Sequence, residues 1–374
     1  MSVGTPHGME EQTLGDVDLV TAELLRELVD VEGPCVSLLL PTSRFGPGTL
    51  SGPARLRHLE DQAAADLRAT GCDDPSIERL LAPVRALHGN DDFWQHQGDG
   101  LALFAAPGFF AHLRLPAALP EQAVVGDDFR VAPLVPLVSA DGGFFILALA
   151  QNSVRLFHAT KQGFGELALG AIPGSMQEAI PQEEAERHGQ SHSTGATRVQ
   201  FHGQGSEADY DKAALERYFR AVDRPLTARL GGRGEPLVLA AVRYYLPIYA
   251  AVSRYPQVWG EAVDGNPEQR SPRELHDAAW SLLAQHFAER ERHYLDRYRQ
   301  AAGTGLTLSG AEPLLAAARK GRVDILLLDV ETAQGGGDDL TDAAVAETLR
   351  HNGRVVAVGD LTEVEGAPVA LLRY

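Results

Sequence analysis

Four short runs of apolar residues most constrain how this chain of 374 residues can fold. They are CVSLLLP at 35–41, FFILALA at 144–150, LVLAAV at 237–242 and VDILLLDV at 323–330. A continuous apolar run of this length is typical of a buried strand, whereas a membrane-spanning helix needs about 20 apolar residues. Segments with helical periodicity lie between the runs, so the sequence predicts an α/β fold and no membrane span.

The length and the turn signals divide the chain into three predicted domains. A chain of this length corresponds to two or three domains, at roughly 100–200 residues each. We expect an N-terminal α+β module over 1–138, a central α/β domain over 139–263 and a C-terminal α/β sandwich over 264–374. Segment 127–137, which contains two prolines, is interpreted as the linker that precedes the central domain.

The predicted central domain contains a long stretch without periodicity, 173–208, rich in Gly, Ser and Gln. A loop of more than about 15 residues inside a compact domain is either functional or disordered. Helical periodicity returns over 209–230, and Pro225 is predicted to kink or interrupt that helix. A second helix is expected to begin at 271–274, where Ser-Pro-Arg-Glu forms a capping box with proline at the first helical position.

The net charge of −18 argues at first against a nucleic-acid partner, because phosphate binding normally needs a basic surface. The charge is uneven: the balance is −11 over 1–140, zero over 141–256 and −7 over 257–374. No basic footprint for DNA is present, but the neutral middle leaves a local RNA contact open there. The start of the chain lacks a basic n-region and an apolar h-region, so we expect a cytoplasmic protein.

Several common kinds of site are missing from the sequence. It contains no GxxxxGK[ST] phosphate loop, no HExxH helix, no GxSxG elbow and no dinucleotide fingerprint, so we expect no cofactor. The two cysteines, Cys35 and Cys72, form no CxxC pair. His188, His192 and His202 are either metal ligands or solvated loop histidines. Because their stretch lacks helical periodicity, we favour the second interpretation and expect no metal.

Three arginines follow one face of the helix predicted after the long loop: Arg217, Arg220 and Arg224. One interpretation is a stripe that binds RNA phosphates. The other is a solvated face on which the arginines pair with Glu216 and Asp223, and on composition alone this interpretation is favoured.

The most unusual local feature is the string His202-Gly203-Gln204-Gly205, where the long loop meets that helix. Glycines on both sides of a glutamine permit backbone conformations closed to other residues and a close approach to a ligand. A glutamine amide both donates and accepts hydrogen bonds and can therefore position a water molecule. The string is short, so its position before the helix carries more weight than its composition.

Several segments, in order, carry a resemblance to a known family: ALAQNSVRLFHA, the loop ending in FHGQG, YFRAVDRPL, LVLAAVRYYLPIY, and the closing GRVDILLLDV, GRVVAVGDL and ALLRY. Together they resemble the bacterial branch of the archaeo-eukaryotic class 1 release factors, whose relatives include Pelota and the hibernation factor Balon. The likeness covers about 144–374, and CVSLLLPTSR near the N-terminus resembles the family more loosely.

The resemblance implies an N-terminal module, a central release-factor-like domain that reaches the ribosomal peptidyl-transferase centre, and a C-terminal domain similar to ribosomal protein L7Ae. It implies the ribosome as partner, through rRNA and P-site tRNA, together with a translational GTPase. In the release factors a Gly-Gly-Gln loop directs water at the peptidyl-tRNA ester. Gly203 and Gln204 match its second glycine and its glutamine, His202 stands where the first glycine belongs, and Gly205 where a small residue follows.

Because His202 departs from the family pattern, three hypotheses stay open. The favoured one is a factor that docks in the ribosomal A site, in hibernation or rescue, without chemistry. The second is a peptidyl-tRNA ester hydrolase in which Gln204 positions the water. The third is a stress-response protein that keeps the fold but has left the ribosome, which the charge of −18 favours.

Overall fold

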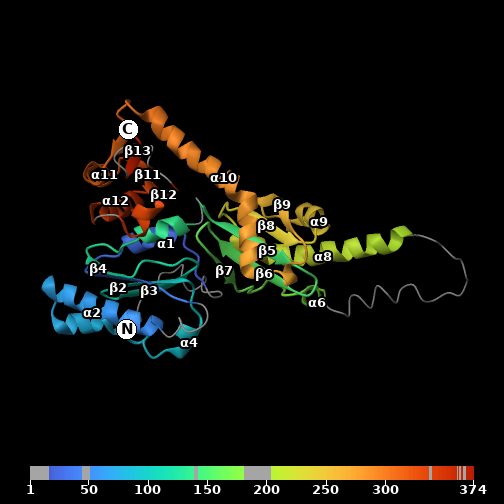
Figure 1. Ribbon diagram of the computed structural model, residues 1–374, viewed down its shortest axis with the longest axis horizontal. Helices are drawn as coiled ribbons and strands as arrows, with labels where there is room; N and C mark the ends of the chain where they lie inside the picture. The colour runs from blue at the N-terminus through green and yellow to red at the C-terminus, as the bar shows by residue number, and fades with distance from the viewer. Residues whose placement is uncertain are drawn as a thin grey trace, which may run out of the picture. The chain divides into compact units, whose positions relative to one another are not determined.

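The computed structural model of the chain contains three β-sheets with helices packed against them (Figure 1). It describes residues 17–43, 51–138, 142–180, 204–336, 339–359, 361, 364 and 368–374. The chain forms two compact units. The first comprises Met1–Gly143, Thr160–Gly165 and Ala284–Tyr374, and the second comprises Phe144–Ala159 and Glu166–Leu283. The mixed α/β fold class predicted from the sequence is confirmed.

The N-terminal part of the first unit is an antiparallel sheet in the order β3-β2-β1-β4. Its strands are β1 (Cys35–Pro41), β2 (Gly100–Ala106), β3 (Phe109–Leu115) and β4 (Gln122–Gly126). Its helices are α1 (Ala22–Val29), α2 (Gly52–Ala69), α3 (Asp74–Arg85), α4 (Asp91–Gln95) and the 3₁₀ helix η2 (Ala132–Leu137).

Strand β1 is buried on both faces, as its continuous apolar run predicts. Val36, Leu38 and Leu40 belong to the core that the sheet forms with α2 and α3. Cys35 and Leu39 alternate with them and belong to a second core on the opposite face.

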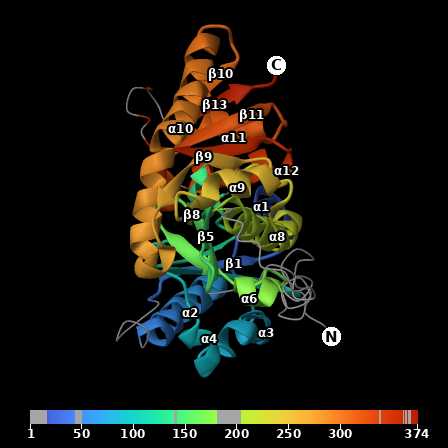
Figure 2. The same ribbon diagram turned by 90° about the vertical axis from the view of Figure 1, so that its right-hand side faces the viewer.

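The C-terminal part of the first unit is a mixed sheet in the order β10-β13-β11-β12. Its strands are β10 (Thr307–Ser309), β11 (Val323–Asp329), β12 (Arg354–Val358) and β13 (Val369–Leu372), and its helices include α11 (Ala311–Ala318), the π-helix η5 (Thr332–Gly336) and α12 (Asp339–Arg350). The long helix α10 (Pro272–Ala301) enters this part over residues 284–301 and packs Tyr294 against one face of the sheet (Figure 2).

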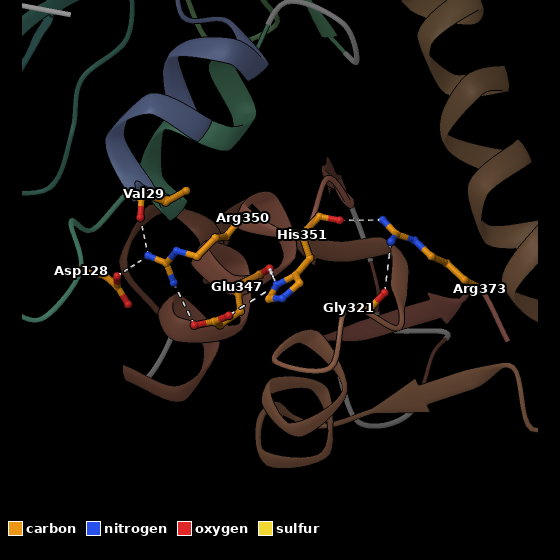
Figure 3. Close-up of polar contacts among 7 residues, drawn as sticks. All are labelled: Val29, Asp128, Gly321, Glu347, Arg350, His351 and Arg373. Atoms are coloured by element: carbon orange, nitrogen blue, oxygen red, sulfur yellow. Dashed lines mark hydrogen bonds and ion pairs between the residues drawn. The ribbon is translucent and has the colours of Figure 1, made fainter. Parts of the chain in front are cut away.

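One hydrophobic core joins the N-terminal and C-terminal parts of the first unit. It combines residues of α1 and η2 with residues of α11, α12 and β11. Polar contacts border it: Arg350 of α12 donates hydrogen bonds to the Val29 carbonyl oxygen, to Asp128 Oδ1 at 2.6 Å and to Glu347 Oε1 at 2.8 Å (Figure 3). Arg130 pairs with Asp342 at 3.1 Å beside the same core.

The interpretation of 127–137 as a linker is wrong. Every residue of η2, which occupies most of that segment, is buried, and η2 belongs to the shared core. Its two prolines fit a 3₁₀ turn because they set φ without needing a backbone donor. The apolar residues between the prolines therefore serve packing, which the proline spacing alone does not reveal.

The second unit is built on a five-stranded sheet in the order β7-β6-β5-β8-β9. Its strands are β5 (Phe144–Leu149), β6 (Val154–Ala159), β7 (Phe164–Leu167), β8 (Leu237–Ala241) and β9 (Val258–Asp264), and its helices are α6 (Met176–Ala179), α8 (Gln204–Leu230), α9 (Tyr245–Val252) and the 3₁₀ helix η4 (Pro267–Gln269). Strand β5 pairs antiparallel with β6 and parallel with β8, and β8 pairs parallel with β9. The first half of α10 packs on β5, where His276 and Trp280 contact the Phe144 ring.

Helix α8 determines where the candidate site lies, and it differs from the expectation at two points. It begins at Gln204, inside the stretch predicted to be a loop, and it is not interrupted at Pro225. The helix runs without interruption past Pro225 to Leu230. Val222, Leu226 and Leu230 are fully buried on both sides of the proline. Packing on this buried stripe therefore outweighs the local cost of the proline, which removes one backbone hydrogen bond.

The capping box predicted for α10 is confirmed. Ser271 N–H donates to Glu274 Oε2 at 2.8 Å, and Glu274 N–H donates to Ser271 Oγ at 3.3 Å. In the part of the chain that the structure describes, no helix is long and apolar enough to cross a membrane.

Candidate nucleic-acid interface

A basic cavity lies where α8 meets the end of α9 in the second unit. It has a volume of about 410 Å³ and is lined by Arg220, Ala221, Asp223, Arg224, Val252 and Arg254. We call it the arginine pocket. Two of the three arginines predicted to form a stripe, Arg220 and Arg224, line this pocket, whereas Arg217 is exposed on α8 without lining it.

A buried carboxylate, Asp223, builds the pocket. Only 2% of this residue is exposed, and its oxygens accept hydrogen bonds from the Tyr249 hydroxyl at 3.1 Å, from the Ser253 hydroxyl, and from Arg254 N–H at 2.8 Å. Thr227 Oγ1 adds a longer contact at 3.4 Å. Asp223 thereby ties the end of α9 and the residues that follow it to α8, and this holds the Arg254 backbone beside the two helix arginines.

The same contacts fix the protonation state of Tyr249. Burial, and then the neighbouring Asp223 carboxylate, raise the pKa of the Tyr249 hydroxyl well above its usual value. The phenol therefore stays protonated at neutral pH and keeps donating to the carboxylate. These donors satisfy the buried Asp223 carboxylate without a cationic side chain.

The guanidinium groups of the pocket face solvent. Arg220 donates to Glu216 Oε2 at 3.1 Å and is 58% exposed. Arg224 and Arg254 are also exposed, and among the described residues neither guanidinium has a hydrogen-bond or ion-pair partner. The predicted Glu216 pair therefore forms, but Asp223 bonds to α9 and to the residues after it instead of the arginine side chains. At least two cationic groups are left available to a ligand.

This arrangement is suited to binding an anion. A guanidinium presents a planar fork of donors that matches the oxygens of a phosphate or carboxylate. The residues that line the pocket include no histidine, cysteine, serine or lysine that could act as nucleophile or base. The one carboxylate of the lining, Asp223, already accepts hydrogen bonds from Tyr249, Ser253 and Arg254. The pocket can therefore hold a phosphate group.

Sequence reasoning missed Arg254. It follows α9 in an irregular segment, so no helical periodicity connects it with Arg220 and Arg224. It reaches them because its backbone N–H bonds to a side chain 31 positions earlier. The available signal was Asp223, an acidic residue on the otherwise apolar stripe of a helix.

The candidate catalytic string, His202-Gly203-Gln204-Gly205, lies only partly within the residues that the structure describes. His202 and Gly203 fall outside the described residues, as do His188 and His192. Gln204 and Gly205 are the first residues of α8, and only their backbone is described. Among the residues that the structure does describe, no group of three or more His, Cys, Asp or Glu side chains could hold a metal ion.

A comparison with protein families identifies this segment. Residues 143–322, which include the arginine pocket, match the family described as bacterial archaeo-eukaryotic release factor family 3. Over this segment the chain is similar to the bacterial archaeo-eukaryotic release factors, and the resemblance predicted from the sequence is confirmed. No protein of curated function matches the chain.

The solved structures that match the chain are distant in sequence. An archaeal translation termination factor, aRF1, is 14% identical, with 95% of this chain and 99% of that chain covered and a TM-score of 0.24. Pelota of Archaeoglobus fulgidus is 12% identical, with 96% and 93% covered and a TM-score of 0.30. A model of ribosome-bound archaeal Pelota with ABCE1 is 11% identical, with 95% of each chain covered and a TM-score of 0.37.

Proposed function

We propose that this chain is a ribosome-associated translation factor that docks in the A site, in hibernation or rescue, and that its arginine pocket contacts an RNA phosphate there. The observation that carries the proposal is the arginine pocket, which lies in the segment that matches a release factor family. In this pocket the guanidinium groups of Arg224 and Arg254 are available to a ligand, because the nearby Asp223 carboxylate accepts its hydrogen bonds from other groups. The net charge of −18 makes such a local basic site necessary, because the surface as a whole repels RNA.

The partners follow from the family resemblance. They are rRNA and P-site tRNA, and a translational GTPase that would deliver or release the factor. One similar structure is of Pelota bound to the ribosome, which supports the ribosome as target. No cofactor, metal or DNA enters the proposal. An A-site factor works on cytoplasmic ribosomes, so the proposed location is the cytoplasm.

Sedimentation of the tagged full-length protein with ribosomes from growing and starved cells, at two salt concentrations, tests the proposal. Comigration with 70S particles or subunits is expected, and comigration confined to starved cells indicates hibernation. Comigration with stalled complexes indicates rescue. Absence from ribosomes in both states would overturn the proposal and favour the non-ribosomal stress protein.

A pair of double variants then tests the pocket. Arg224→Gln with Arg254→Gln should weaken ribosome binding, and each lost phosphate contact should reduce the slope of log affinity against log salt by roughly 0.7–0.9. The matched control is Arg57→Gln with Arg319→Gln, two exposed arginines that have no polar partner among the described residues. Both double variants change the net charge equally, so equal weakening by the two would rule out a specific pocket.

Peptidyl-tRNA hydrolysis is the second candidate function, and Gln204 at the start of α8 is the observation that favours it. If the loop is catalytic, Gln204→Ala should reduce peptide release from stalled complexes on the order of 100-fold while ribosome binding persists. A second Gly-Gln pair, Gly189-Gln190, occurs earlier in the stretch 173–208, and Gln190→Ala is the matched control. Wild-type protein that binds stalled ribosomes but releases no peptide supports docking alone.

A further inference from the structure

The three strands β5, β8 and β9 run parallel and side by side in the second unit (Figure 1). A second cavity lies at their carboxyl ends. It has a volume of about 200 Å³. In open α/β sheets, ligands bind in the crevice outside the carboxyl ends of the strands. The volume is below the roughly 300–1,000 Å³ of sites that enclose a drug-sized ligand, so it suits a single small ring system.

The lining of this cavity, which we call the amide pocket, differs chemically from the arginine pocket. Its polar rim consists of Gln151, Asn152, Tyr245, Asn266 and Glu268. Leu149, Ala150 and Pro267 supply a buried apolar floor. None of the described residues that line it is basic. The lining therefore offers no cationic partner to a phosphate and favours an uncharged ligand with hydrogen-bond donors.

The carboxylate of the rim, Glu268, is held in position by hydrogen bonds from neutral side chains. Ser153 Oγ donates to Glu268 Oε1 at 3.1 Å, and Asn266 Nδ2 donates to Glu268 Oε2 at 3.3 Å. Glu268 N–H returns a bond to Asn266 Oδ1 at 3.0 Å. These partners are neutral donors, and a carboxylate has further acceptor sites besides the ones they use.

Two large apolar side chains at the amide pocket or next to it in sequence are exposed to solvent. Val242, which lines the pocket, is 40% exposed, and Tyr244 is 56% exposed. They account for two of the five large apolar side chains exposed in the described part of the chain. Arg243 between them is also exposed. An exposed aromatic ring next to an arginine is the combination on which unpaired bases stack in RNA-binding proteins.

We infer that the amide pocket binds an unpaired nucleobase that carries an exocyclic amino group, with Glu268 accepting from that group and Tyr244 stacking beside it. Adenine, cytosine and guanine carry such a donor, and uracil does not. A carboxylate that accepts from the cytosine amino group is a known mode of base recognition. The inference rests on the proposed function only because it takes the ligand to be RNA. In that function the arginine pocket would contact an RNA phosphate, and the amide pocket would select the base.

Free nucleosides test the inference on the full chain. Adenosine, cytidine and uridine are titrated into the protein and followed by saturation-transfer NMR. Adenosine and cytidine should bind at least fivefold more tightly than uridine. Glu268→Ala should abolish this preference, whereas Glu261→Ala, an exposed β9 residue with the same charge change outside the pocket, should keep it. Tyr244→Ala should weaken all binding about tenfold and Tyr244→Phe should restore it.

Two outcomes overturn the inference: equal binding of uridine and adenosine, or no nucleoside binding at all. Persistence of the preference in Glu268→Ala also overturns it. Nucleosides carry no phosphate, so their binding does not depend on the arginine pocket. If the protein does not associate with ribosomes but keeps its nucleoside preference, only the proposed function is refuted. If it associates with ribosomes but shows no nucleoside preference, only the base pocket is refuted.

Discussion

Arg350 joins the two parts of the first unit, and replacing it with methionine tests whether they unfold together. Methionine keeps the apolar stem and removes the guanidinium. Its loss leaves the Val29 carbonyl without its donor, costing about 1 kcal/mol. The Asp128 pair, about 30% exposed on both sides, contributes about 1 kcal/mol after solvent screening. The Glu347 pair, three residues away on α12, adds about 0.5 kcal/mol.

The free energy of unfolding of the first unit should therefore fall by roughly 2–3 kcal/mol. Hydrogen exchange followed by mass spectrometry, at increasing urea, measures this fall separately for peptides of β1 and of β11. Both should lose the same protection, because one core spans both sheets. Arg319→Met, an exposed residue with no polar partner among the described residues, is the control and should change stability by at most about 0.5 kcal/mol. Loss of protection in β11 alone, with β1 unchanged, would refute the reasoning.

Two further predictions concern buried polar groups. Asp223→Ala should lower the free energy of unfolding of the second unit by about 3 kcal/mol, because several donors lose their charged acceptor; a urea titration that shows less than about 1 kcal/mol would contradict this. Burial, and then Arg114, lower the pKa of His112 to about 4. The folded state thus disfavours the imidazolium. The free energy of unfolding should therefore be highest above the ordinary pKa of 6.5, and it should fall by up to about 3 kcal/mol as the pH is lowered from 6.5 towards 4. His112→Phe should remove that part of the pH dependence in urea titrations at pH 7 and pH 4.5, and an unchanged pH dependence would count against it.

Local pattern was enough to predict most of the elements. The predominantly apolar runs at 35–41, 237–242 and 323–330 became β1, β8 and β11, because a short apolar segment can be buried only where neighbouring strands satisfy its backbone. The capping box predicted the start of α10 because its two reciprocal hydrogen bonds join residues only three apart.

Where the outcome depended on partners far away in sequence, local pattern gave the wrong answer. The segment now seen as η2 carries linker-like prolines, but its burial is decided by residues of α12 about 200 positions later, which complete the same core. Pro225 is a helix breaker by its own chemistry, and α8 continues past it because Val222 and Leu226 are anchored in the unit.

The candidate site shows the same division. The sequence by itself determined that Arg220 and Arg224 share a helix face, because their spacing is a property of the α-helix, and it determined the release factor resemblance through its motifs. Only the tertiary structure decided that Arg254 completes the pocket and that Asp223 is a buried acceptor instead of a surface counter-ion. The physical reason is that a hydrogen bond between α8 and the residues after α9 has no local signature: it forms when the fold brings donor and carboxylate together and removes both from water.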